Sequence, residues 1–356
     1  MSFFRKNKNL VGLDIGSSAV KAVELKELGK GKGYQLVSVG IEPLSPEAIV
    51  DGAIMDSGLV AETIQRLFTT NRMKAQDVAI SLSGHSVIIK KISLPQMSEE
   101  ELAESIQWEA EQYIPFDVDD VNIDYQVLEG PSLSGEGNMD VLLVAVKKDK
   151  INDYTTVLAN AGKAAQVVDV DVFALQNAFE ANYDVPADQV IALINLGASV
   201  TNIAILQGGS SIFWRDITIG GNLYTEAVAK ELGVPFEHAE MLKRGQPVDG
   251  ADSERVPAVL QAVSEQVGTE IQKTLDFFKA TSSSDPVTLM VLSGGASQTP
   301  NLNTYLSQRF ETQVEMLDPF RQIAVNDRQF PAERLEPVGA AASVAVGLAL
   351  RKAGDR

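Results

Sequence analysis

Short apolar runs alternate with amphipathic segments along the whole chain. Three apolar runs stand close together near the start, at 11–15, 19–25 and 34–41, with short polar turns between them. Runs of this length bounded by turn residues predict three consecutive β-strands. The later segments alternate between helix and strand periodicity, which is typical of an α/β protein.

Further elements follow from the same pattern. Helices are predicted at 58–70, 98–113 and 151–161 and within 222–280; strands are predicted at 78–82, 87–94, 121–128, 141–146, 166–170 and 287–292. The helix after Ser98 has the clearest start signal, because Glu101 three residues later completes a capping box, and Pro115 ends the helical run. A loop rich in Gly and Ser is predicted at 130–138.

An internal repeat is the most informative feature of this organisation. The segment VGLDIGSSAVKAVEL (11–25) aligns with ALINLGASVTNIAIL (192–206) at an offset of 181 residues. Gly16 then falls on Gly197, and Asp14 falls on Asn195. A single glycine turn between two strands is ordinary hairpin chemistry, but two copies in matching places predict a duplicated fold.

The first hairpin has the chemistry of a phosphate site. Gly16 lets the backbone approach an anion, and Ser17 and Ser18 add hydroxyl donors. Lys21 on the outgoing strand could reach a phosphate, while Asp14 could hold Mg²⁺ through water. The alternative for Asp14 is a residue that stabilises the turn. In the second copy, the corresponding phosphate-binding residues are Gly197, Ala198 and Ser199.

A third glycine turn follows the predicted strand 287–292. Gly294, Gly295 and Ala296 leave a surface without bulk, on which a purine or ribose could lie. A plain strand-to-helix turn is the alternative. Two glycine hairpins half a chain apart, followed by a strand that ends in Gly-Gly, resemble the actin–Hsp70–sugar-kinase ATPase fold, and this resemblance implies ATP and Mg²⁺ as ligands.

The same resemblance assigns roles to three further side chains. Asp171 falls where the family often has an acidic residue near metal-bound water, so it is a weak metal candidate and the one catalytic candidate; a helix N-cap is the alternative. Glu240 and Lys243 would contact ribose and base, and an ordinary ion pair on a solvated helix is their alternative. The segment 169–179 would be the helix linking the halves, and the small-residue run from Gly339 would close the fold.

Composition limits the possible partners. The 356-residue chain carries a formal net charge of −18, which argues against binding to nucleic-acid backbones or an anionic membrane surface. It has no cysteine and two histidines, so cysteine-ligated zinc and thiolate catalysis are excluded. The longest apolar run, 338–350, is shorter than the roughly 20 residues of a membrane helix. We expect a cytoplasmic protein that reaches a membrane only through a partner.

Three segments narrow the family. The opening NLVGLDIGSSAVKAVEL, the stretch WEAEQYIPFDVDDVNIDYQVL (108–128) and EIQKTLDFFKA (270–280) closely resemble the PilM family of type IV pilus assembly. The resemblance implies a first actin-like domain (1–83, 165–187 and 337–356), an inserted 1C-like subdomain (84–164), a second domain (188–220 and 287–336) and a 2B subdomain (221–286).

The resemblance also implies a partner. PilM proteins bind the short cytoplasmic N-terminal segment of the inner-membrane protein PilN, so the region 84–164 together with the first domain is the expected docking region. Four apolar or aromatic residues of that region, Trp108, Tyr113, Ile114 and Phe116, are expected in its core rather than in direct contact with the peptide.

One residue departs from the family pattern. Asn195 stands where related ATPases carry Asp, and it keeps hydrogen-bonding capacity but lacks the charge that orders Mg²⁺. Because phosphoryl transfer depends on charge neutralisation, we expect ATP binding with slow hydrolysis or none, and only a weak metal role for Asn195. A small-molecule kinase and an FtsA-like division protein are the alternative functions; the sequence shows neither a sugar-binding polar cluster nor a C-terminal amphipathic helix.

Overall fold

Two five-stranded sheets with the same topology form the centre of the molecule. The computed structural model describes residues 10–29, 31–128, 137–282 and 284–355. In spatial order the first sheet contains β10 (Ala164–Val170), β6 (Asp77–Leu82), β1 (Val11–Ile15), β2 (Ala19–Glu27) and β3 (Tyr34–Pro43). The second contains β15 (Gln313–Met316), β14 (Leu289–Ser293), β11 (Val190–Leu196), β12 (Thr201–Gln207) and β13 (Ser210–Ile217).

The pairing directions of the two sheets correspond strand by strand. The first three strands in chain order pair antiparallel in each sheet, and the remaining two strands pair parallel on the side of the first. The repeat in the sequence is therefore a repeat of a whole sheet. This confirms the predicted α/β fold of two duplicated units.

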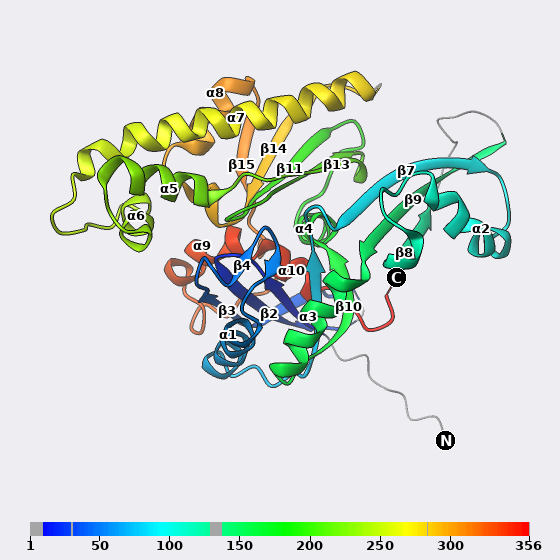
Figure 1. Ribbon diagram of the computed structural model, residues 1–356, viewed down its shortest axis with the longest axis horizontal. Helices are drawn as coiled ribbons and strands as arrows, with labels where there is room; N and C mark the ends of the chain where they lie inside the picture. The colour runs from blue at the N-terminus through cyan, green and yellow to red at the C-terminus, as the bar shows by residue number, and fades with distance from the viewer. Residues whose placement is uncertain (1–9, 30, 129–136, 283, 356) are drawn as a thin grey trace.

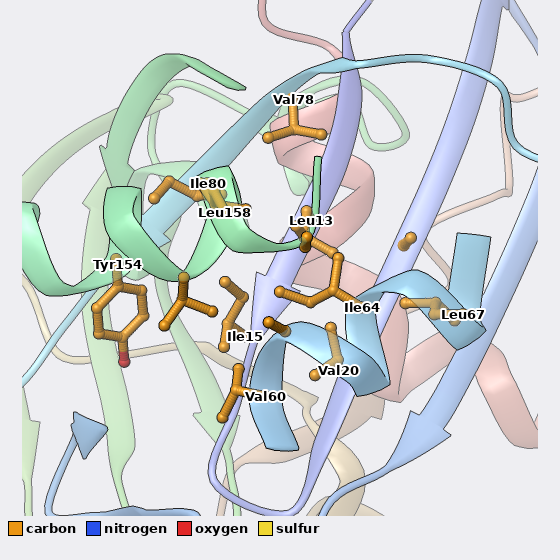
Figure 2. Packing of buried hydrophobic residues seen from close by; sticks show 14 of the residues in the cluster. Leu13, Ile15, Val20, Val60, Ile64, Leu67, Val78, Ile80, Tyr154 and Leu158 are labelled. Atoms are coloured by element: carbon orange, nitrogen blue, oxygen red, sulfur yellow. The ribbon is translucent and has the colours of Figure 1, made fainter. Parts of the chain in front are cut away.

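Helices cover both faces of each sheet (Figure 1). On the outer face of the first sheet lie α1 (Ser57–Thr70) and α3 (Lys148–Asn160), whose apolar side chains pack against those of β1, β2 and β6 in Figure 2. The outer face of the second sheet is covered by α7 (Val256–Thr281) and α8 (Leu302–Phe310), and beside it α5 (Gly221–Leu232) and α6 (Phe236–Lys243) pack against each other and against α7. Each helix that lies on a sheet places an apolar stripe against it, which is the burial pattern that stabilises such layers.

Two helices lie on the inner faces. The buried residues of α4 (Asp171–Glu180) pack against the second sheet, and α10 (Ser343–Ala349) packs against the first sheet and α4. Gly347 allows the close approach, since a Cβ there would lie 1.6 Å from the carbonyl oxygen of Ala174. The small-residue run is thus a core helix, preceded by α9 (Ala332–Gly339) and the 3₁₀ turn η4 (Ala340–Ala342).

A third sheet projects from the side of the first half. It contains β7 (Val87–Pro95), β9 (Asn138–Lys147) and β8 (Val121–Val127) in that order, with α2 (Glu99–Glu111) packed on it. Ser98 and Glu101 form the predicted capping box at the start of α2. Most of the Gly/Ser-rich loop, 130–136, lies outside the described residues.

Several short elements complete the chain. They are the hairpin of β4 (Ile49–Val50) and β5 (Ala53–Ile54) and the 3₁₀ turns η1 (Val118–Asp120), η2 (Ser253–Arg255) and η3 (Gly295–Gln298). Among the described residues, no helix combines the length and the apolar character needed to cross a membrane.

The aromatic set of the inserted region is only partly in its core. Ile114 is buried and Phe116 packs against the same cluster, as expected. Trp108 is 74% exposed and Tyr113 is 39% exposed, so the expectation was wrong for these two residues. The physical reason is the phase of α2, whose buried positions are Leu102, Ile106 and Ala110, so that Trp108 falls on the opposite face.

Candidate functional site

The first glycine hairpin joins β1 to β2 and brings together its charged residues. Asp14 and Lys21 are cross-strand neighbours, and Lys21 Nζ lies 2.8 Å from Asp14 Oδ2. The turn is closed by the Gly16 N–H, which donates to the carbonyl of Ala19 over 3.1 Å. The ammonium of Lys21 therefore lies beside the turn, within reach of an anion bound there. Asp14 therefore forms an ion pair with Lys21 and does not only stabilise the turn.

The second hairpin has a neutral pair at the equivalent positions. Asn195 and Asn202 face each other across β11 and β12, and Asn195 Nδ2 donates to Asn202 Oδ1 over 2.9 Å. The offset of 181 residues carries Asp14 onto Asn195 and Lys21 onto Asn202. The two hairpins thus have cross-strand pairs at equivalent positions, charged in the first and neutral in the second.

The two hairpins meet at the centre of the molecule. Ser17 Oγ lies 2.9 Å from Ser199 Oγ, and Asn222 Nδ2 donates to Ser199 Oγ over 3.3 Å. Asn222 comes from the start of α5, whose Gly221 N–H donates to the carbonyl of Gly197. Residues from both halves that the sequence assigned to phosphate binding are therefore adjacent in space.

Asp171 lies at the carboxyl end of the first sheet. It is the first residue of α4, and the N-cap position belongs to Val170, so Asp171 is not the N-cap of this helix. Its carboxylate accepts hydrogen bonds from Ser81, at 2.6 Å, and from Ser83. Burial and the nearby charge of Asp14 raise the pKa of Asp171 to about 6. The carboxylates of Asp14 and Asp171 are thus close enough for the charge of one to affect the ionisation of the other.

The proximity of Asp14 and Asp171 decides whether a metal ion can bind here. Two carboxylates whose charges oppose each other are stabilised by a cation between them, and Mg²⁺ takes one or two carboxylates and keeps its other ligands as water or phosphate. In the described part of the chain, no group of three or more carboxylate or imidazole side chains gathers as a complete cage. The donors present fit a water-rich Mg²⁺ that is held together with phosphates.

Glu240 and Lys243 form a buried network rather than a solvated pair. Lys243 Nζ lies 2.5 Å from Glu240 Oε2 and also donates to Thr225 Oγ1 and to the carbonyl of Gly221. Burial lowers the pKa of Lys243, against the opposing effect of the Glu240 charge. The ion pair predicted as an alternative is present, but it fixes α6 to the start of α5.

The third glycine turn is adjacent to this network. A Cβ at Gly221 would lie 3.0 Å from Ala296 Cβ and 3.6 Å from Lys243 Nζ, so Gly221 separates the two. Gly294 N–H donates to the carbonyl of Ala340 over 2.8 Å, which ties this turn to the last helices of the chain. The third turn therefore lies beside the network of Glu240 and Lys243.

Sequence reasoning missed several polar residues beside Asp171. Ser81 and Ser83 could have been found, because they stand at the end of a predicted strand. Lys150 and Tyr154 of α3 carried no such signal. Lys150 Nζ donates to the carbonyl of Gly52 in the β4–β5 hairpin, and burial lowers its pKa while the charge of Asp171 raises it. Burial, followed by the charges of Asp171 and Asp14, raises the pKa of Tyr154.

A groove of about 410 Å³ separates the inserted sheet from the second sheet. One wall is formed by β7 and the other by β13; its lining includes Ile88, Ile89, Lys90, Trp214, Arg215 and Asp216. Both strands pair on one side only within the described sheets. The ring of Trp214 packs edge-on against Phe173, and its buried Nε1–H has no hydrogen-bond partner in the described part of the chain.

A second hollow, of about 580 Å³, lies away from both hairpins. Its lining includes Tyr34, Asn177 and Arg351 and none of the residues that the sequence assigned to the site. Arg351, one of the charged residues that line it, already forms a salt bridge with Asp169 at 2.6 Å, which ties the end of the chain to β10. Size alone therefore does not identify the functional cleft.

Duplicated sheets whose glycine hairpins meet at the centre of the molecule define an actin-like ATPase fold. MreB5 of Spiroplasma citri bound to ADP is similar, with a TM-score of 0.51 and 14% identity over 95% of this chain and 94% of that one. The cell division protein FtsA of Escherichia coli (strain K12) is 24% identical over 368 residues, which cover 90% of this chain and 86% of FtsA.

The family itself is narrower. Residues 12–353 match the family described as type IV pilus assembly protein PilM, and the chain belongs to this family. The solved PilM–PilN type IV pilus biogenesis complex contains a chain with a TM-score of 0.86 to this one and 29% identity, over 97% of this chain and 98% of that chain.

Proposed function

We propose that this protein is a nucleotide-binding cytoplasmic adaptor of the type IV pilus inner-membrane complex, which binds the N-terminal cytoplasmic segment of a PilN-type membrane protein. Membership of the PilM family and the likeness to the PilM–PilN complex support the partner. The groove between β7 and β13 is the single structural observation that carries the proposal, because it offers an extended peptide two unpaired strand edges.

The groove suits a short extended segment for a second reason. Its lining combines the apolar side chains of Ile88, Ile89 and Trp214 with the exposed cations Lys90 and Arg215. Apolar side chains of the peptide would pack against the apolar part of this lining.

The nucleotide belongs to the cleft between the hairpins. Ser17, Ser18 and Lys21 from one side and Gly197, Ala198 and Ser199 from the other would hold the phosphates. Asp14, with Asp171 and weakly Asn195, would hold Mg²⁺ through water; bound Mg²⁺ would neutralise phosphate charge. Gly294, Gly295, Ala296, Glu240 and Lys243 would line the adenosine side. Because the Asn195–Asn202 pair is neutral, the nucleotide acts as a clamp between the halves more than as fuel.

Two measurements test this function. Purified protein is denatured and the released small molecules are identified by chromatography and mass spectrometry, with ATP or ADP expected. A synthetic peptide of a PilN-type cytoplasmic N-terminus is then titrated by calorimetry, with and without Mg²⁺-nucleotide. Peptide binding in neither condition would overturn the adaptor proposal.

Charge reversal locates the peptide. Lys90→Glu and Arg215→Glu change exposed groove cations and leave the core intact, so both variants should fold and lose at least about tenfold in peptide affinity. Lys26→Glu makes the same change at an exposed position at the end of β2 and should keep the affinity of the wild type. Equal affinities for all three variants would move the docking site away from this groove.

A further inference from the structure

The groove and the cleft are built from the same two halves. One wall of the groove is β7, the next strand along the chain after β6 of the first sheet. The other wall is β13 of the second sheet. The hairpins that meet at Ser17 and Ser199 belong to the same two sheets. Any ligand that separates or fixes the hairpins therefore also sets the distance between the walls of the groove.

A continuous chain of hydrogen bonds joins the two places. Asn195 Nδ2 donates to Asn202 Oδ1 over 2.9 Å, and Asn202 Nδ2 donates to Asp216 Oδ1 over 2.8 Å. Asp216 Oδ2 in turn accepts the backbone N–H of Gly84 over 2.7 Å. The chain begins at the strand end of the second phosphate hairpin and ends in the loop that leads into β7.

Asp216 is the member of this chain that touches both halves. Its strand β13 belongs to the second sheet, whereas Gly84 lies between β6 and β7. Burial raises the pKa of Asp216, and the hydrogen bonds from Asn202 and Gly84 oppose this effect. A buried carboxylate is costly when it loses its donors, so the relative position of the two halves is strongly tied to these two contacts.

We propose that Asp216, through Asn202, couples the nucleotide cleft to the partner groove, so that a bound nucleotide tightens the binding of the peptide. This inference rests on the proposed function. A nucleotide held by both hairpins fixes the two halves in one relative position, and the Asn195–Asn202–Asp216–Gly84 chain transmits that position to the loop before β7. The peptide then meets a groove whose walls are already set, which lowers the entropic cost of its binding.

The test compares peptide affinity with and without a non-hydrolysable ATP analogue and Mg²⁺. The wild type is expected to bind the peptide about tenfold more tightly with the analogue, within the usual range of such couplings. Asp216→Asn preserves volume but cannot accept from both donors, so the ratio of the two affinities should fall to about one. Asn202→Ala removes the middle link and should have the same effect; thermal unfolding of each variant establishes that it is folded.

Thr218→Ala is the matched control. Thr218 Oγ1 and His85 Nε2 lie 3.3 Å apart and form a second bridge between the same two segments, but this bridge does not lead to Asn195. Its loss should alter peptide affinity equally in both nucleotide states and keep the ratio of the wild type.

The possible results separate the two proposals. A wild-type protein that binds the peptide equally well with and without the analogue contradicts the coupling and leaves the adaptor function standing. Unchanged ratios in Asp216→Asn and Asn202→Ala would likewise overturn the role of Asp216. Absence of peptide binding in every condition would instead refute the proposed function itself.

Discussion

Ser17 Oγ and Ser199 Oγ lie 2.9 Å apart, each at the turn of one glycine hairpin. This hydrogen bond spans the two halves of the molecule, and its members are 182 positions apart in the sequence. A phosphate bound between the hairpins would replace it, because its oxygens accept from both hydroxyls. The contact therefore marks the point at which we expect the nucleotide to enter.

Replacing Ser17 tests that position. Ser17→Ala removes a neutral hydrogen bond and should lower the free energy of unfolding by only about 1 kcal/mol. A hydroxyl that donates to a charged phosphate contributes more, so the affinity for ATP should fall by about tenfold or more. Fluorescence titration with a labelled nucleotide measures the affinity, and Ser45→Ala, an exposed change outside both hairpins, serves as the control. Wild-type affinity in Ser17→Ala would place the phosphates elsewhere.

Adjacent glycines of the third turn should respond in opposite ways to alanine. Gly294 has φ of 87°, and a Cβ there would lie 2.2 Å from the carbonyl oxygen of Leu196; Gly294→Ala should cost about 3 kcal/mol or more in stability. A Cβ at Gly295 would meet no atom within 4 Å, so Gly295→Ala should fold normally. If adenosine lies against this turn, Gly295→Ala should nevertheless weaken nucleotide binding several-fold. Normal stability of Gly294→Ala, or full affinity of Gly295→Ala, would contradict these assignments.

The elements of the two main sheets could largely be predicted because their strands are continuous apolar runs. The strands β1, β6, β11 and β12 are buried along most of their length, and burial of this kind is visible in composition alone. Strand β13 was not predicted, since it is an edge strand whose exposed positions are polar and interrupt the pattern. The two-residue strands β4 and β5 are too short to show the alternation of apolar and polar residues from which a strand is predicted.

The residues of the site, like the strands, include some that could be predicted from the sequence and some that could not. Residues at the glycine turns could be found because the turns are repeated in the sequence. Asp216 and Lys150 could not, because each acquires its partners only when distant segments come together: Asp216 with Gly84, and Lys150 with Gly52. The residues next to them in the sequence do not indicate these contacts. Trp108 is the opposite case: its aromatic side chain predicts a buried position, but it lies on the exposed face of its helix.

Asn195 is more than a missing carboxylate. Its amide donates to Asn202 Oδ1, and Asn202 Nδ2 donates to Asp216, so Asn195→Asp would place a carboxylate oxygen, which cannot donate, against Asn202 Oδ1. We expect this variant to lose about 1–3 kcal/mol in the free energy of unfolding. The added charge should also increase the Mg²⁺ dependence of nucleotide binding and raise the rate of ATP hydrolysis. Phosphate release assays and urea unfolding measure these effects; no gain in either Mg²⁺ dependence or hydrolysis would count against our account of the neutral pair.

Stability of the metal-free protein should depend on pH through Asp171. The pKa of Asp171 is raised from 3.8 in the unfolded chain to about 6 in the folded one, so the folded state binds its proton more tightly. Its contribution to stability is therefore fully present below pH 3.8 and is lost as the pH rises through 6, a change of about 3 kcal/mol. Asp171→Asn keeps an acceptor for the Ser81 hydroxyl and carries no charge, so it should be more stable than the wild type at pH 8 and lose that advantage towards pH 4. Urea unfolding at both pH values in EDTA, without nucleotide, measures the difference, with Asp249→Asn in an exposed loop as the control for loss of a carboxylate. A difference between Asp171→Asn and the wild type that does not change with pH would show that burial does not hold this proton.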